Sequence, residues 1–132
     1  MANKAIGVDG CRGGWIAAIG LADGSIRWKV AAKFSDILEE ALESEWILVD
    51  MIIGLPEGEA SSRECDRLAR KVIRPHSSRV FSAPHRAALS AGTYAEANAL
   101  NRQACGSGLS KQCFYLFPKI RELDTVLHPN VR

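Results

Sequence analysis

Residues 4–20 of the 132-residue chain read KAIGVDGCRGGWIAAIG. The apolar residues at 5–8 predict a strand over residues 4–9, and those at 15–19 predict a second strand over residues 14–20. Asp9 ends the first strand, and a glycine-rich segment follows it. Its glycines suit either a tight turn between antiparallel strands or the close approach of a ligand to the backbone. The stretch therefore predicts a strand pair with a carboxylate at one end.

The next segments extend this pair. An Asp-Gly turn at residues 23–24 predicts that a third strand, over residues 25–31, pairs with the second. Ser35 or Asp36 is expected to cap a helix that ends near Ser44. The first third of the chain is therefore predicted to be a three-stranded antiparallel meander followed by a helix.

Residues 46–50 read WILVD and repeat the opening pattern, an apolar run that ends in a carboxylate. A strand that follows a helical crossover lies most easily parallel to an earlier strand. If it pairs beside the first strand, Asp9 and Asp50 end neighbouring strands roughly 4.8 Å apart. Two carboxylates that close repel each other unless a proton, an arginine or a divalent cation neutralises them.

The second half of the chain is predicted to be helical. Ser61 and Glu64 have the capping-box spacing for a helix that ends near residue 73, before Pro75. Residues 76–84 are expected to be an extended segment or loop. Further helices are predicted from Thr93 to Cys105, with Gly106 as the stop, and from Ser110 onward, with a kink or division at Pro118.

Basic residues form a stripe on the helix predicted over residues 61–73. Its members recur at helical spacing and are Arg63, Arg67, Arg70, Lys71 and Arg74. This basic stripe either contacts phosphates or is a solvated helix face. Asp66, on the same helix, is expected to form an ion pair with Arg70.

Three further arginines are candidates for phosphate contacts. Arg12 lies in the glycine-rich segment, where it either clamps a phosphate or points into solvent. Arg79 and Arg86 flank an apolar loop. They suit the backbone of a nucleic acid or ion pairs with Glu57 or Glu59.

Composition is that of a soluble globular protein, because 47% of the residues are hydrophobic and 24% are charged. No apolar stretch approaches the roughly 18 residues of a membrane span, so no membrane association and a cytoplasmic location are expected. Residues 1–60 hold 5 Lys/Arg against 10 Asp/Glu, a net charge of −5, and residues 61–132 hold 12 against 5, a net charge of +7. This asymmetry fits a phosphate-handling site or an unevenly charged surface. The four cysteines are expected to be reduced and mostly buried.

Five blocks of the sequence occur in the same order as in a known family. They read GVDGCRGGW, VDMIIGLP, RECDRLAR, SSRVFSAPHRAAL and GLSKQCFYLFPKIRELD. In these blocks the chain resembles a domain-of-unknown-function family of predicted RNase H-fold nucleases, within the ribonuclease H-like superfamily. The resemblance implies a single α/β domain over residues 1–132, with a three-stranded antiparallel meander plus a parallel strand. It also implies a further strand and helix with an acidic segment in the family, so the chain is expected to be truncated at its C-terminus.

The same resemblance implies a metal-dependent nuclease that hydrolyses phosphodiester bonds with two Mg²⁺ or Mn²⁺ ions. Asp9 and Asp50 match the strand-end carboxylates that act in catalysis and hold the metal in that fold. Such a site needs at least three carboxylates, and the in-chain stand-ins are Glu122, Asp124 or Asp66. The expected partner is DNA or RNA, bound by Arg12, Arg79, Arg86 and the basic stripe.

Two other functions remain open from the sequence. One is a non-catalytic nucleic-acid-binding or assembly module that keeps the basic helix and has lost the active site. The other is an actin-like binder of Mg²⁺-nucleotide phosphates that uses Asp9 and the glycines of DGCRGG. A homodimer is a further expectation, because a second copy would cover the open edge of the sheet.

Overall fold

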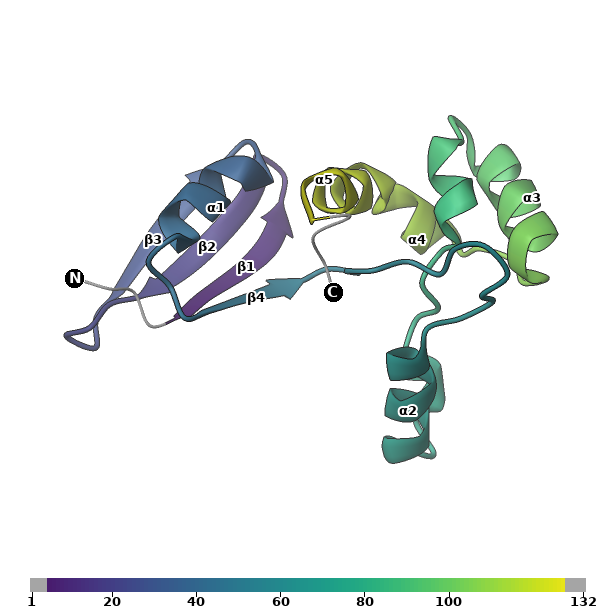
Figure 1. Ribbon diagram of the computed structural model, residues 1–132, viewed down its shortest axis with the longest axis horizontal. Helices are drawn as coiled ribbons and strands as arrows, with labels where there is room; N and C mark the ends of the chain where they lie inside the picture. The colour runs from purple at the N-terminus through teal and green to yellow at the C-terminus, as the bar shows by residue number, and fades with distance from the viewer. Residues whose placement is uncertain (1–4, 128–132) are drawn as a thin grey trace. The chain divides into compact units, whose positions relative to one another are not determined.

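The computed structural model describes residues 5–127 and contains one four-stranded sheet within them. Its strands are β1 (Ala5–Cys11), β2 (Gly14–Gly20), β3 (Ile26–Ala31) and β4 (Trp46–Asp50). Their order is β3-β2-β1-β4, with β4 parallel to β1 and the other pairs antiparallel (Figure 1). The predicted mixed sheet of an α/β fold is therefore confirmed. Lys4, the first residue of the predicted opening strand, lies outside the described residues.

The pairing register places Asp9 and Asp50 opposite each other. β1 and β4 pair in parallel from Ala5 opposite Trp46 to Asp9 opposite Asp50. Side chains alternate between the two faces along a strand, so register partners in this pair point to the same face. A shift by one residue would send one carboxylate to the opposite face. The predicted juxtaposition of the two strand ends is confirmed.

One face of the sheet carries the hydrophobic core of its unit. Ile6, Val8, Ala17 and Ile19 are buried there. Helix α1 (Phe34–Ala41) lies against the sheet (Figure 1) and contributes the buried side chains of Phe34, Ile37 and Ala41. The Phe34 ring meets the Trp15 ring edge-on, with centroids 5.1 Å apart, an arrangement that adds to the gain from burial.

Helix α1 is capped by a distant part of the chain. Its first residue is Phe34, and the residue before it provides no side-chain cap. The Phe34 N–H instead donates to one carboxylate oxygen of Glu122, whose other oxygen accepts from Trp15 Nε1–H at 2.9 Å. The cap predicted at residues 35–36 is wrong, because this long-range contact satisfies a free amide of the first turn. The helix also ends before the predicted Ser44.

The described residues divide into two compact units. Unit 1 holds the sheet and α1 within residues 5–51, together with residues 122–127. Unit 2 holds residues 52–121. The boundary falls within helix α5 (Phe117–Leu127), which contributes residues to both units.

Unit 2 is helical between its loops. Its elements are α2 (Glu64–Val72), the short 3-10 helices η1 (Ser77–Arg79) and η2 (Arg86–Ser90), α3 (Tyr94–Cys105), α4 (Lys111–Tyr115) and the first part of α5. Three predicted helix ends are confirmed, since Thr93 caps α3, Gly106 ends it with φ 76°, and Ser110 caps α4. The helix expected from Ser110 onward is divided, as predicted, but the division lies at Leu116, between α4 and α5, and Pro118 is the second residue of α5. No helix within residues 5–127 is long and apolar enough to cross a membrane.

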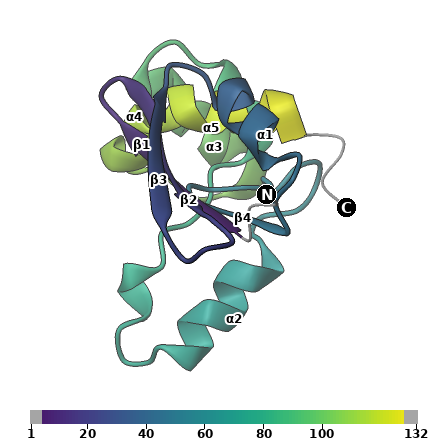
Figure 2. The same cartoon turned by 90° about the vertical axis from the view of Figure 1, so that its left-hand side faces the viewer.

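Helix α2 differs from its prediction at its start, and its apolar face is exposed. It begins at Glu64 rather than at Ser61, and no side chain caps it. Asp66 is its one buried residue, and the helix stands apart from α3 and α4 in Figure 1 and in Figure 2. Leu68 and Val72 are 48% and 83% exposed. The apolar face of α2 is therefore not part of the core of unit 2.

The turn between β1 and β2 requires a glycine at position 14. Gly14 has φ 127°, and a Cβ there would lie 2.3 Å from the carbonyl oxygen of Ala31 and 2.7 Å from that of Ala32. Gly14→Ala is expected to lower the free energy of unfolding by about 2–4 kcal/mol, because backbone atoms yield less than side chains. Chemical denaturation followed by circular dichroism measures this change. The control is Gly13→Ala, whose Cβ would meet only Val30 Cγ1 at 3.9 Å, and an equal loss in both variants would contradict the prediction.

Candidate functional site: paired strand-end carboxylates

Asp9 and Asp50 line a shallow hollow of about 610 Å³ on the exposed face of the sheet. The residues around it are Gly7, Val8, Asp9, Ile16, Ala18, Trp28, Leu48, Val49 and Asp50. Both aspartates are exposed. Asp9 Oδ1 accepts a hydrogen bond from the Gly10 N–H at 2.7 Å, and this bond orients the carboxylate. The two carboxylates are thus presented to solvent at one end of the hollow.

The floor and walls of the hollow follow from the strand register. Gly7 on β1 and Ala18 on β2 are register partners with little or no side chain. Leu48 on β4 pairs with Gly7, and Trp28 on β3 pairs with Ala18. The small residues therefore form the floor between Leu48 and Trp28, each 66% exposed. The two carboxylates lie two residues further along β1 and β4 on this face.

The glycine-rich segment after Asp9 serves the hairpin. Gly14 is the glycine that another part of the backbone approaches closely, and the approaching atoms belong to Ala31 and Ala32. Arg12 lies exposed in the same turn. Of the two uses predicted for these glycines, a tight turn accounts for Gly14.

The donor chemistry of the paired aspartates fits a divalent cation. Mg²⁺ is commonly held by one or two carboxylates together with waters and substrate phosphate oxygens. Asp9 and Asp50 offer two carboxylates on one face. Within residues 5–127, no group of three or more His, Cys, Asp or Glu side chains is placed to hold a metal. The described side chains therefore suit one ion that takes its remaining oxygens from water or substrate.

Of the other predicted ligands, Glu122 and Asp124 lie on α5, and Asp66 lies on α2. Both carboxylate oxygens of Glu122 accept hydrogen bonds, one from the Trp15 indole and one from the Phe34 N–H. Asp124 is half-buried two residues further on. Neither residue completes a three-residue metal-binding group in the part of the chain that the structure describes. Their role as further ligands stays a prediction.

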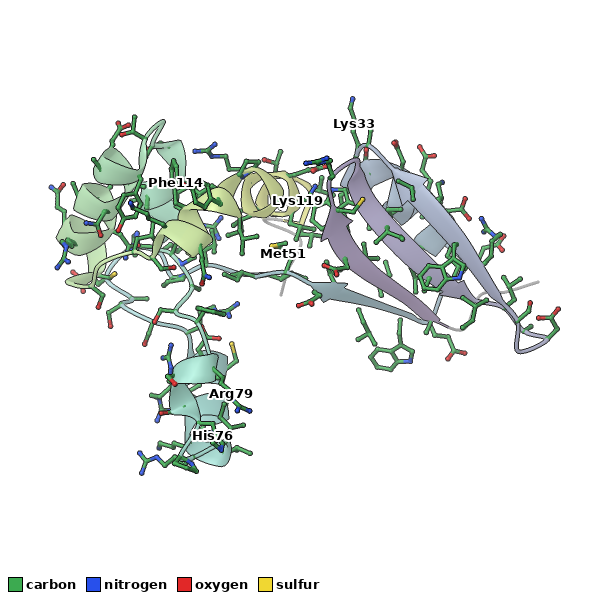
Figure 3. The ribbon with its side chains drawn as sticks, turned by 180° about the vertical axis from the view of Figure 1, so that it is seen from behind. Lys33, Met51, His76, Arg79, Phe114 and Lys119 are labelled. Atoms are coloured by element: carbon green, nitrogen blue, oxygen red, sulfur yellow. The ribbon has the colours of Figure 1, made fainter. Side chains whose placement is uncertain are left out.

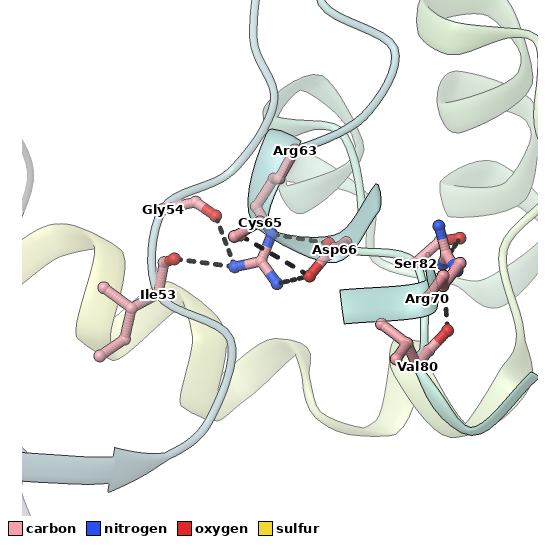
Figure 4. A network of polar contacts seen from close by, with 8 residues as sticks. All are labelled: Ile53, Gly54, Arg63, Cys65, Asp66, Arg70, Val80 and Ser82. Atoms are coloured by element: carbon pink, nitrogen blue, oxygen red, sulfur yellow. Dashed lines mark hydrogen bonds and ion pairs between the residues drawn. The ribbon is translucent and has the colours of Figure 1, made fainter. Parts of the chain in front are cut away.

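Arg63 and Asp66 form a polar network in unit 2 (Figure 4). The Arg63 guanidinium donates to both Asp66 carboxylate oxygens, at 2.8 Å and 2.5 Å. Its Nη1 also donates to the carbonyls of Ile53 and Gly54, at 2.9 and 3.2 Å. The hydrogen bonds to Asp66 raise the pKa of Arg63. The ion pair predicted between Asp66 and Arg70 is wrong, because Arg63 occupies the carboxylate from the helix start.

Arg70 is also engaged within unit 2. Its Nη2 donates to the Val80 carbonyl at 3.0 Å and to the Ser82 hydroxyl at 2.9 Å (Figure 4). These bonds tie α2 to the segment that follows η1. Two of the five residues of the basic stripe, Arg63 and Arg70, therefore hold loops in place.

Four of the remaining predicted phosphate-binding residues on and beside α2 are exposed, whereas Arg86 is half-buried. Arg67 pairs with Glu64 on the surface of α2, Lys71 is exposed near the end of the helix, and Arg74 is exposed in the turn that follows it. Arg79 is exposed beside α2 (Figure 3). Arg86 lies 2.8 Å from a Glu57 carboxylate oxygen, one of the two ion pairs predicted for it.

Trp28 is not among the site residues predicted from the sequence, although the sequence of β3 has a pattern that places it on an apolar face. Apolar and basic residues alternate along β3, a pattern typical of a strand with one apolar face. The apolar face is the exposed one, with Ile26, Trp28 and Val30 at 61%, 66% and 63% exposure. Arg27 and Lys29 instead reach Glu40 on α1, at 2.6 and 3.0 Å, and their hydrogen bonds lower the pKa of Glu40.

The four cysteines are free thiols. Cys113 is buried, and burial raises its pKa to about 11, which keeps the thiol protonated and weakly nucleophilic. Cys65 is exposed on α2, and Cys11 and Cys105 are partly exposed. The expectation that most cysteines are buried is wrong, because these three lie at surface turns or helix faces.

The fold and the paired carboxylates define an α/β protein with a candidate cation site at the end of two parallel strands. The chain belongs to the family described as "Protein of unknown function (DUF429)", whose model matches residues 7–132. No curated protein and no solved structure matches the chain significantly. Membership of a domain-of-unknown-function family is therefore confirmed, and it carries no activity with it.

The Arg63–Asp66 pair is expected to stabilise unit 2 more than a surface pair does. The two side chains are 19% and 10% exposed. Asp66→Asn is expected to lower the free energy of unfolding by about 2–4 kcal/mol, because it leaves a largely buried guanidinium without its carboxylate. Urea denaturation measures the loss. In the control, Glu64→Gln removes the exposed partner of Arg67 and is expected to cost about 0–1 kcal/mol, so similar losses would contradict the assignment.

Proposed function

We propose that this chain binds Mg²⁺ or Mn²⁺ at Asp9 and Asp50 and acts as a metal-dependent nuclease. The observation that supports the proposal is the register pairing of two exposed carboxylates at the ends of neighbouring parallel strands. The residues that line their hollow include no Lys or Arg. A divalent cation relieves the repulsion between two such carboxylates.

The chain's own residues have distinct roles in this proposal. A bound divalent ion supplies Lewis-acid polarisation of a phosphodiester and an activated water. Asp9 and Asp50 would hold the ion through hard oxygen donors, and substrate and water would supply its remaining ligands. The Gly10 N–H keeps the Asp9 carboxylate in one orientation. Trp28 offers an exposed aromatic surface in the same hollow, on which a base can stack.

Calorimetric titration of Mn²⁺ tests the metal site. The unaltered chain is expected to bind a single ion, and the double variant Asp9→Asn, Asp50→Asn is expected to lose this binding because both anionic ligands are gone. Glu39→Gln is the control, since it removes an exposed carboxylate of α1 and is expected to leave binding unchanged. No binding by the unaltered chain, or equal binding by the double variant, would contradict the proposal.

Cleavage assays test the reaction once metal binding is established. Labelled single-stranded and duplex DNA and RNA are incubated with the chain and Mn²⁺. Cleavage is expected to fall to background in EDTA and in the Asp9→Asn, Asp50→Asn variant. Cleavage that survives both changes would assign the activity to something other than this site.

A second candidate function is a non-catalytic nucleic-acid-binding module. The observation that favours it is the set of exposed cations on and beside α2, namely Arg67, Lys71, Arg74 and Arg79. Helix α2 buries only Asp66, so most of its surface is open to a ligand. Lys and Arg in this arrangement contact phosphates regardless of base sequence.

Fluorescence anisotropy with a labelled oligonucleotide in EDTA tests this candidate. The double variant Lys71→Ala, Arg74→Ala is expected to weaken binding and to reduce the slope of log K against log salt by about 1 for each phosphate that the variant no longer neutralises. Lys33→Ala removes an exposed cation from unit 1 and is the control. Affinity that is independent of salt, or equal losses in both variants, would argue against binding through α2.

A further inference from the structure

We propose that the surface formed by α2 and the segment through Ser82 binds single-stranded nucleic acid, with one base stacked on the Phe81 ring. The inference rests on the second candidate function above and names the form of its ligand. It is supported by an exposed aromatic ring on a hydrogen-bonded segment, by the cations of that segment and of α2, and by the apolar side chains that α2 exposes.

Phe81 is an exposed aromatic side chain at the end of a hydrogen-bonded segment. It is 62% exposed. Three backbone hydrogen bonds of 2.8, 3.0 and 3.2 Å link the residues from Ile73, at the end of α2, to Val80. The backbone that leads from α2 to the ring is therefore held in place by its own turns.

Arg70 fixes the backbone on both sides of this ring. Its Nη2 donates to the Val80 carbonyl at 3.0 Å and to the Ser82 hydroxyl at 2.9 Å (Figure 4). Because Val80 and Ser82 flank Phe81 in the chain, α2 holds the segment that carries the ring. A segment that is ordered before the ligand arrives loses less conformational entropy on binding, which favours affinity.

The same part of the chain is strongly basic. Residues 63–82 hold six Lys or Arg against two Asp or Glu, a net charge of +4. Both acids already form ion pairs with arginines of this range. Lys71, Arg74 and Arg79 are exposed, and Arg79 lies beside α2 in Figure 3. The phosphates of a nucleic acid complement this charge.

The apolar side chains of α2 favour a single strand over a duplex. Leu68 and Val72 are 48% and 83% exposed on the helix that carries Lys71. A duplex would meet the cations with its phosphates while its bases stay stacked inside, so the apolar side chains would gain no partner. A single strand offers the faces of unstacked bases, which stack on aromatic side chains beside a basic groove.

The spacing of Arg79 and Phe81 suits one nucleotide. They are two residues apart, so at most roughly 7 Å of backbone separates them. A nucleotide carries its phosphate and its base on one sugar. In the proposed complex, the phosphate contacts Arg79 and the base stacks on Phe81.

Fluorescence anisotropy in EDTA tests the inference with labelled DNA and RNA oligonucleotides of about 12 nucleotides, since one binding module covers roughly 4–16 nucleotides. Each is used as a single strand and annealed to its complement. The unaltered chain is expected to prefer the single strand by at least about fivefold. Phe81→Ala is expected to weaken single-strand binding by about 5- to 150-fold, the loss of one stacked base, and to leave duplex binding unchanged. Phe81→Tyr keeps the ring and is expected to keep the affinity.

The matched control removes another exposed aromatic ring of unit 2. Tyr115 on α4 is 74% exposed, and Tyr115→Ala is expected to leave binding unchanged. The salt dependence gives a second readout. Phe81→Ala is expected to leave the slope of log K against log salt as it is, because it removes no charge, whereas Lys71→Ala, Arg74→Ala reduces that slope. Circular dichroism checks that each variant remains folded.

The outcomes separate this inference from the function on which it rests. Failure to bind any of the oligonucleotides at low salt overturns both. Equal affinity for single strand and duplex, with no loss in Phe81→Ala, overturns the inference and leaves the second candidate function standing. An equal loss in Tyr115→Ala, or a loss in Phe81→Tyr as large as in Phe81→Ala, overturns the assignment of the stacked base to Phe81.

Discussion

The parallel pairing of β1 with β4 is the constraint on which the candidate site depends. Its register sets Asp9 opposite Asp50 and sends both carboxylates to the exposed face, while Ile6 and Val8 enter the core. A slip of one residue would reverse this division and bury a carboxylate. Among the strands within residues 5–127, none pairs with the other side of β4. One interaction between two strands therefore sets the position of the candidate cation site.

The charged residues of the chain divide into those that hold the fold and those that face solvent. Arg63 binds Asp66 and two loop carbonyls, and Arg70 holds the segment after η1. Glu122 caps the start of α1 by accepting a hydrogen bond from the Phe34 N–H. Lys71 on α2 and Arg74 in the turn after it remain exposed. Arg63 and Arg70 are therefore engaged in holding the loops. Arg67, Lys71 and Arg74 are the members of the basic stripe that a phosphate ligand can contact without releasing those loops.

Local signals predicted the elements well, and long-range contacts account for the errors. Thr93, Gly106 and Ser110 mark helix ends as predicted, because each cap is a hydrogen bond or a backbone conformation within a few residues. Ser61 fails although its spacing to Glu64 is correct, because Arg63 is held at the helix start by Asp66 and two carbonyls. The cap expected for α1 fails because a carboxylate from another part of the chain takes its place.

The sequence by itself determined the strands, the turns between them and the two carboxylates at strand ends, because alternation, glycine and strand length act over a few residues. Only the tertiary structure decided which face of β3 is exposed and which residue forms an ion pair with Asp66. It also decided that Glu122 accepts hydrogen bonds from the start of α1 and from the Trp15 indole. The Glu122 side chain joins Phe34 and Trp15, which are 88 and 107 positions away in the chain. Nothing in the local pattern of any of the three residues specifies such a contact. It exists because folding brings a buried amide and a buried indole N–H to the one carboxylate that satisfies both.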